Sequence, residues 1–155
     1  MPISRILQAL AIAGALLLAP CSLSAQDKGM LAKATSIKCT FSLVSVGTWG
    51  NPQPTAVVKP VNLVLQFDGI KADEGTAQLQ SNVGQYDIIV RYAEGYLHFI
   101  QSFLDGPLYT TTILEKRTSS GKLKAMHSRH AFTDFALPGF TSSPEQYYGE
   151  CEVLN

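Results

Sequence analysis

The sequence predicts an all-β domain of eight antiparallel strands, connected in chain order as an up-and-down meander and closed as a small barrel. Apolar and polar residues alternate with a period of two along most of residues 37–153. Turn-forming Gly, Pro, Asn and Asp residues interrupt this alternation about every 10 to 15 residues, as in all-β domains. No stretch after residue 25 has a helical period.

The first half of the domain shows the alternation most clearly. Ile37, Cys39, Phe41 and Leu43 alternate with polar residues, which is typical of a strand with one buried face. Two glycines and two prolines then predict a loop over residues 47–54. The first four strands are expected at residues 37–43, 61–67, 76–80 and 86–92.

The second half continues the pattern with four more strands. Asp105-Gly106-Pro107 is a strong turn signal, and the strand after it is rich in threonine, which favours β-structure. A longer loop with two prolines precedes the last strand. These strands are expected at residues 96–103, 108–115, 123–130 and 146–153.

Two cysteines suggest how the meander closes. Cys39 lies in the first predicted strand and Cys151 in the last. A disulfide between them needs Cα atoms within about 7 Å, so the terminal strands would be neighbours, as in a closed barrel. A two-sheet sandwich with adjacent terminal strands is the alternative. An eight-stranded barrel either fills its interior with side chains or holds one small ligand, and the sequence leaves both open.

The N-terminus has the three parts of a cleaved signal peptide over residues 1–25. Arg5 supplies the positive charge, residues 6–19 are apolar, and Ala25 is the best final residue before cleavage. The apolar run of about 14 residues is short for a membrane span, which needs about 20. Cys21 offers a lipoprotein alternative, which the preceding Pro20 disfavours because a small residue is preferred there.

Removal of the signal peptide leaves a short lead-in at residues 26–35 and one domain at residues 36–155. It also removes Cys21, leaving an even number of cysteines suited to an oxidising compartment. We therefore expect a periplasmic or secreted protein, with no membrane span after cleavage.

Charge excludes some partners. Lys plus Arg falls from 12 to 11 on removal of Arg5, while Asp plus Glu stays at 12, so the net charge is about −1. No basic cluster is present. We therefore expect no nucleic-acid partner and no attraction to an anionic membrane surface.

His127, Arg129 and His130 form the most promising polar group. Residues three apart on a strand point to opposite faces, so the two histidines should not share a metal, and we expect no metal or other cofactor. Arg129, if it faces inward with the apolar residues of its strand, needs a buried partner, because an unpaired charge there is costly. The candidates are Asp87, Glu115, Glu150 and the tyrosine hydroxyls.

Three aromatic residues complete the candidate ligand contacts. Tyr147 and Tyr148 should lie on opposite faces of the last strand. Trp49 ends a Gly-Thr-Trp sequence that resembles the Gly-x-Trp signature of lipocalins and related barrels, which hold small apolar ligands. A full strand precedes it here, whereas in those families the tryptophan belongs to the first strand.

A wider similarity covers most of the domain. It rests on a Cys-Thr-Phe strand, a Leu-x-Phe-Asp strand end, His-Ser-Arg-His at 127–130 and Gln-Tyr-Tyr-Gly at 146–149 before Cys151. In these features the chain resembles a group of small exported bacterial proteins of uncharacterised function. The resemblance implies a bacterial source and a periplasmic or extracellular location, and it carries no activity.

Enzyme signatures fit the chain poorly. The sequence has no Gly-x-Ser-x-Gly, no His-Glu-x-x-His and no phosphate-binding glycine loop. We therefore expect a non-catalytic barrel that binds a small apolar molecule or a partner. The alternatives are a periplasmic enzyme using Arg129 with His127 or His130, and a structural envelope protein without a ligand.

Overall fold

The computed structural model describes residues 29–49, 53–81, 84–104, 106–131 and 143–154. The predicted signal peptide, Cys21 and most of the predicted 131–144 loop lie outside these residues. The described residues form eight strands and one short 3₁₀ helix, η1 (Met30–Lys33). The strands are β1 (Ile37–Trp49), β2 (Pro54–Lys71), β3 (Thr76–Ser81), β4 (Gly84–Ala93), β5 (Tyr96–Ser102), β6 (Leu108–Arg117), β7 (Leu123–His130) and β8 (Glu145–Val153).

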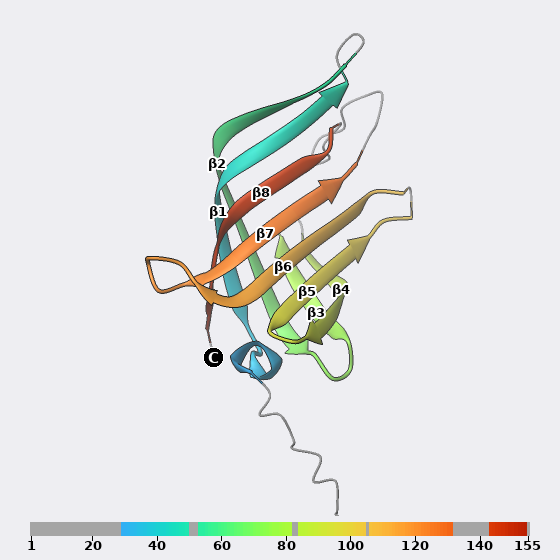
Figure 1. The fold of residues 1–155 in the computed structure, drawn as a ribbon. Coiled ribbons are helices and arrows are strands. Elements are labelled where there is room, and N and C mark those ends of the chain that lie inside the picture. The colour runs from blue at the N-terminus through green and yellow to red at the C-terminus, as the bar shows by residue number, and fades with distance from the viewer. Residues whose placement is uncertain (1–28, 50–52, 82–83, 105, 132–142, 155) are drawn as a thin grey trace, which may run out of the picture.

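The strands form a closed barrel. Each strand pairs antiparallel with the next in the sequence, and β8 pairs with β1. Figure 1 shows this ring of strands in chain order. The predicted eight-stranded meander is confirmed, and the sandwich alternative is wrong. Closure gives every terminal strand a partner and so removes the free edges of an open sheet.

The disulfide lies at the seam where the barrel closes. Cys39 of β1 and Cys151 of β8 are direct cross-strand partners, and a disulfide joins them with Cα atoms 4.0 Å apart. Both side chains are fully buried. The predicted bridge and the predicted contact between first and last strands are therefore confirmed.

Side chains fill the barrel interior. Three buried phenylalanines, Phe41, Phe67 and Phe99, occupy its centre, and the rings of Phe67 and Phe99 stack with centroids 3.9 Å apart. The described residues leave an internal cavity of only about 10 Å³. That is room for about one water molecule. In this conformation the interior is a packed core, the first of the two alternatives for an eight-stranded barrel.

Gly149 permits a close approach across the seam. A Cβ at this position would overlap the Thr40 carbonyl oxygen and lie 2.6 Å from the Phe41 Cα. The β1 register also shifts between Phe41 and Leu43, where a bulge bends the strand. The glycine thus lets Phe41 reach the core at the point where β1 bends.

The first hairpin is longer than the sequence predicted. Residues 47–54 were expected to form a loop, but β1 and β2 stay paired from Leu43 and Pro60 up to Trp49 and Pro54. We call this part, residues 43–49 and 54–60, the β1–β2 arm; it extends past the other strands (Figure 1). Among the described residues β3 pairs with β2 only from Gln66 onward. The edge of β2 that faces away from β1 therefore has no described strand partner in the arm. This open edge is why Pro54 and Pro60, which have no N–H to donate, are tolerated in the strand.

The opposite end of the barrel is plugged by η1 (Figure 1). Leu31 of this helix is fully buried, and its backbone N–H donates to Glu115 Oε1 at 2.7 Å. The lead-in at residues 26–35 therefore contributes to the core, a role that the sequence prediction missed. Within the part of the chain that is described, no helix has the length and apolarity needed to cross a membrane.

Candidate functional site

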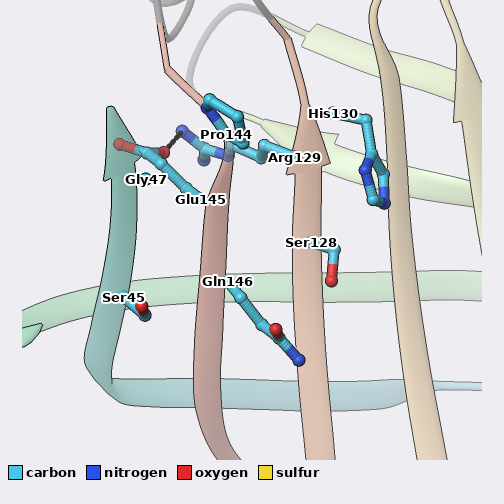
Figure 2. A pocket seen from close by; sticks show the side chains of 8 residues that line it. All are labelled: Ser45, Gly47, Ser128, Arg129, His130, Pro144, Glu145 and Gln146. Carbon is cyan, nitrogen blue, oxygen red and sulfur yellow. Dashed lines mark ion pairs between the residues drawn. The ribbon is translucent and has the colours of Figure 1, made fainter. Parts of the chain in front are cut away.

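Strand β7 carries the polar group at the end of the barrel opposite η1. Alternation along the strand turns His127 and Arg129 inward and Ser128 and His130 outward. His127 is 4% exposed, whereas His130 is exposed and points away from Arg129 (Figure 2). The prediction that the two histidines lie on opposite faces is confirmed. Among the described residues no three His, Cys, Asp or Glu side chains cluster as metal ligands would.

Both ring nitrogens of His127 have hydrogen-bond partners. Nδ1 lies 2.9 Å from Thr111 Oγ1, and Arg129 Nε donates to Nε2 at 3.2 Å. A guanidinium can only donate, so Nε2 must be the unprotonated nitrogen. Nδ1 then carries the proton and donates to Thr111. The ring also contacts three aromatic side chains, those of Phe41, Tyr109 and Tyr147.

This environment keeps His127 neutral. Burial, and secondarily the positive charge of Arg129, lower the pKa of His127 to about 3. The imidazole is therefore uncharged near neutral pH, and its Nε2 atom acts as a fixed hydrogen-bond acceptor for Arg129. It has no free nitrogen with which to accept a proton from a substrate.

Arg129 lies between two tyrosine rings at the barrel rim. Its guanidinium carbon is 5.3 Å from the Tyr109 ring centroid and 5.1 Å from that of Tyr147. Its Nη1 atom is 3.7 Å from Glu145 Oε2, the ion pair drawn in Figure 2. The Arg129 side chain keeps 21% of its surface exposed. The cation is thus held by π-faces, a carboxylate and a histidine, yet remains open to solvent.

The expected acidic partners of Arg129 are wrong. Asp87 is on the outer face of β4, where its carboxylate lies 3.4 Å from the Gln78 amide. Glu115 holds η1. Glu150 accepts hydrogen bonds from Thr118 and Ser120 on the outside of the barrel. The sequence prediction began β8 one residue too late and so missed Glu145. The expected tyrosine hydroxyls are not partners of Arg129 either; the tyrosines that contact it, Tyr109 and Tyr147, do so with their ring faces.

Tyr147 fixes the carboxylate that faces Arg129. Its hydroxyl donates to Glu145 Oε2 at 2.5 Å. Burial and this hydrogen bond raise the pKa of Tyr147 to about 12, so the phenol stays protonated. The hydroxyl of the neighbouring Tyr109 is buried, with no hydrogen-bond partner among the described residues.

The other two aromatic candidates lie outside this cluster. Tyr148 points outward from β8 and is 39% exposed, so the predicted separation of the two tyrosines is confirmed. Trp49 is the last residue of β1, and its side chain is outside the described part of the structure.

A hollow adjoins Arg129 where β1, β7 and β8 end. Its volume is about 210 Å³, smaller than typical pockets for drug-sized ligands. Figure 2 shows that hydroxyl, amide, imidazole, carboxylate and guanidinium groups line it. Ser45, Gln146 and Ser128 are cross-strand partners on the outer face, so the hollow lies on the outer side of these strands. The lining residues are Ser45, Gly47, Ser128, Arg129, His130, Pro144, Glu145 and Gln146.

The inward-facing residues next to the rim form one continuous row around the barrel. Cross-strand partners share a face, so this row follows from the pairing of the strands. We call it the rim row: Val57, Val46, Glu145, Arg129, Tyr109 and Gln101. Its first two members are apolar and the other four are polar. The alternation of β8 already puts Glu145 on the face of Tyr147 and Cys151, which is the sequence signal that would have found it.

The geometry brings together one of the predicted pairs and separates the other. Arg129 and His127 converge within hydrogen-bond distance, whereas His130 does not join them. Both histidine nitrogens are occupied, and the two described cysteines form the disulfide. This arrangement positions a cation and offers no described nucleophile activated by a base.

Comparison with known proteins adds no relative. No protein-family model matches the chain, and no curated protein and no solved structure shows significant similarity to it. The function is therefore argued from the geometry of the site.

Proposed function

We propose that this protein is an exported, non-catalytic binding module whose small-molecule ligand contacts Arg129 at the open end of the barrel. Export is supported by the signal-like pattern of residues 1–25 and by the buried disulfide, which suits an oxidising compartment. Binding without catalysis is supported by the occupied nitrogens of His127.

The observation that carries the proposal is the held but accessible guanidinium of Arg129. Two tyrosine rings and His127 fix its position, and its side chain keeps 21% of its surface exposed. A charge placed this way has already lost much of its side-chain freedom, so a ligand gains affinity from its preorganisation. Barrel closure does not require such a charge, because the disulfide and core already join the strands.

The filled interior restricts where the ligand sits. The stacked Phe67 and Phe99 rings leave no space for a wholly apolar ligand inside the barrel in this conformation. The expected small apolar ligand therefore becomes, in this proposal, a molecule bound at the rim with at least one polar group. An enzymatic role for Arg129 and His127 would need His127 to exchange protons, which its environment disfavours.

The test uses the secreted, disulfide-bonded chain recovered from the periplasm of a bacterial host. Native mass spectrometry should show a small-molecule adduct, and amide NMR shifts on adding small-molecule extract should concentrate at the ends of β7 and β8. Arg129→Gln should abolish both signals. Lys124→Gln, which removes an exposed cation from the outer face of the same strand, should not.

Two results would contradict the proposal. One is the absence of any adduct and of any rim shift, which is the outcome expected of a structural envelope protein. The other is an equal loss of binding in the two variants, because the cation at the rim would then have no special role. Retention of the chain in the cytoplasm after fractionation would separately contradict export.

A further inference from the structure

We infer that the ligand of this site is a small amphipathic anion, whose acidic group contacts Arg129 and whose apolar tail lies on the inner face of the β1–β2 arm. The inference rests on the proposed function and names the chemical class of its ligand. It follows from the rim row, in which Glu145 alone separates the apolar residue Val46 from Arg129.

The apolar half of the rim row is exposed although it faces inward. Val57 pairs with Val46 across the arm, and Val46 pairs with Glu145. Val57 is nevertheless 59% exposed, because β3 pairs with β2 only from Gln66 onward and no described strand faces the arm there. The exposed side chain of Val57 therefore offers apolar surface on which a tail could lie.

The exposed apolar surface continues toward the core. Val61 and Leu63 of β2 are half-buried and pack against the buried core residues, as does Val46. A tail lying along this inner face would join the core surface at one end and the rim at the other. It would need no displacement of the stacked phenylalanines.

Charge on this face favours an anionic head. Lys59 pairs with Val44, whose side chain is buried inside the barrel, so Lys59 is on the inner face of the arm as well. Lys59 and Arg129 thus give two cations on the described inner face of β1, β2, β7 and β8. Glu145 is the one carboxylate there, and it already accepts a hydrogen bond from Tyr147. A ligand acid group would compete with Glu145 for Arg129 and restore charge balance.

The first experiment measures the affinities of four related compounds for the disulfide-bonded mature chain by calorimetry. Octanoate has head and tail, acetate has the head alone, 1-octanol lacks the charge, and octyltrimethylammonium reverses it. Each buried methylene strengthens binding about fourfold, so burying three gives octanoate about a 60-fold advantage over acetate. Loss of the charge-assisted hydrogen bonds should make 1-octanol at least about tenfold weaker than octanoate.

The second experiment uses matched substitutions on the two faces of the arm. Val57→Ser removes apolar surface from the inner face, and Val58→Ser removes it from the outer face, where Val58 is equally exposed at 60%. Val57→Ser should weaken octanoate about fourfold, since it removes roughly one buried methylene's worth of apolar contact. Val58→Ser should leave octanoate binding unchanged. Arg129→Gln should bring octanoate down to the affinity of 1-octanol.

Specific results would overturn the inference. Equal affinities for acetate and octanoate, or equal effects of the two valine substitutions, would show that the tail does not contact the inner face of the arm. Equal affinities for octanoate and octyltrimethylammonium would remove the anionic head. If octanoate fails to bind while other compounds still shift the rim amides, this inference fails and the proposed function stands. If nothing shifts the rim, both fail.

Discussion

Acid should destabilise this barrel through His127. The folded protein keeps the imidazole buried and neutral, with its pKa lowered to about 3, whereas the unfolded chain takes up the proton at the ordinary histidine pKa of 6.5. Below pH 6.5 the unfolded state therefore binds more protons than the folded state. By linkage, stability is at its full value above pH 6.5 and is lost as the pH falls toward 3.

The size of the effect follows from that pKa. Each unit below 6.5 lowers the free energy of unfolding by about 1.4 kcal/mol, so about 3 kcal/mol is lost by pH 4.5. At pH 3 the loss is about 4 kcal/mol, a large part of a typical domain's stability. The charged and titratable groups that contact or lie beside the imidazole are Arg129, Glu145, Tyr109 and Tyr147. Tyr147, whose pKa is raised to about 12, keeps its proton throughout this range.

The assay is urea denaturation at several pH values from 7.5 to 4.5 with the disulfide intact, followed by circular dichroism. His127→Gln removes the titrating group, so its stability relative to the native sequence should rise by about 3 kcal/mol between pH 7.5 and 4.5. The control is His130→Gln, which alters the exposed histidine at the end of the same strand. Its stability should change with pH as that of the native protein does. Contributions from carboxylates cancel in these differences.

A pH-independent difference between His127→Gln and the native protein would refute this reasoning. So would an equal response of His130→Gln, because the effect would then belong to histidines in general. Either result would show that the imidazole is protonated, or accessible, in the folded barrel.

Three further predictions concern the construction of the barrel. Replacing both Cys39 and Cys151 by Ala should lower stability by about 4–5 kcal/mol, because the bridge spans a sequence separation of 112 residues; urea midpoints measure this, and the unreduced native chain should resist thiol labelling. Gly149→Ala should cost about 1–3 kcal/mol, since its Cβ meets backbone atoms of β1, whereas Gly47→Ala, with its nearest atom at 3.7 Å, should be nearly neutral. Glu115→Ala should free η1, which faster hydrogen exchange at residues 30–33 would reveal, while unchanged exchange would refute that role.

Much of the barrel is predictable from the sequence because its strands obey a simple physical pattern. Apolar and polar residues must alternate along a strand with one buried face, as they do around Phe41, Phe67 and Phe99. This alternation, together with the turn residues between the runs, located all eight strands. Cysteines in the first and last strands then indicated which strands meet. Both features are local in the sequence or depend on one covalent bond.

Features that depend on the surroundings were harder to predict. Pro52 and Pro54 indicated a loop, but Pro54 begins β2. Proline is acceptable in a strand whose N–H side has no partner, and only the topology reveals that edge. Leu31 sits in a short polar segment, and its burial depends on a barrel end that forms far away in the sequence.

In the candidate site, too, local features could be predicted from the sequence, whereas contacts between strands could not. Alternation predicted that His127 and His130 diverge, and the structure has them on opposite faces. The partner of Arg129 could not be chosen among the acids, because every acid on an inward face is an equal candidate until the register is known. The pairing of β7 with β8 sets Arg129 directly opposite Glu145.

The seam disulfide also determines how the domain would respond to tension. Only residues 29–38 and 152–154 of the described chain lie outside the covalent ring closed by Cys39 and Cys151. A force applied to the two ends would therefore pass from β1 to β8 through the sulfur atoms. Residues 40–150 would carry no load, and the pulled chain would lengthen only by peeling the pairs from Ile37 and Val153 to the bridge. The rim with Arg129 would keep its geometry while the ends are stretched, as long as the bridge is oxidised.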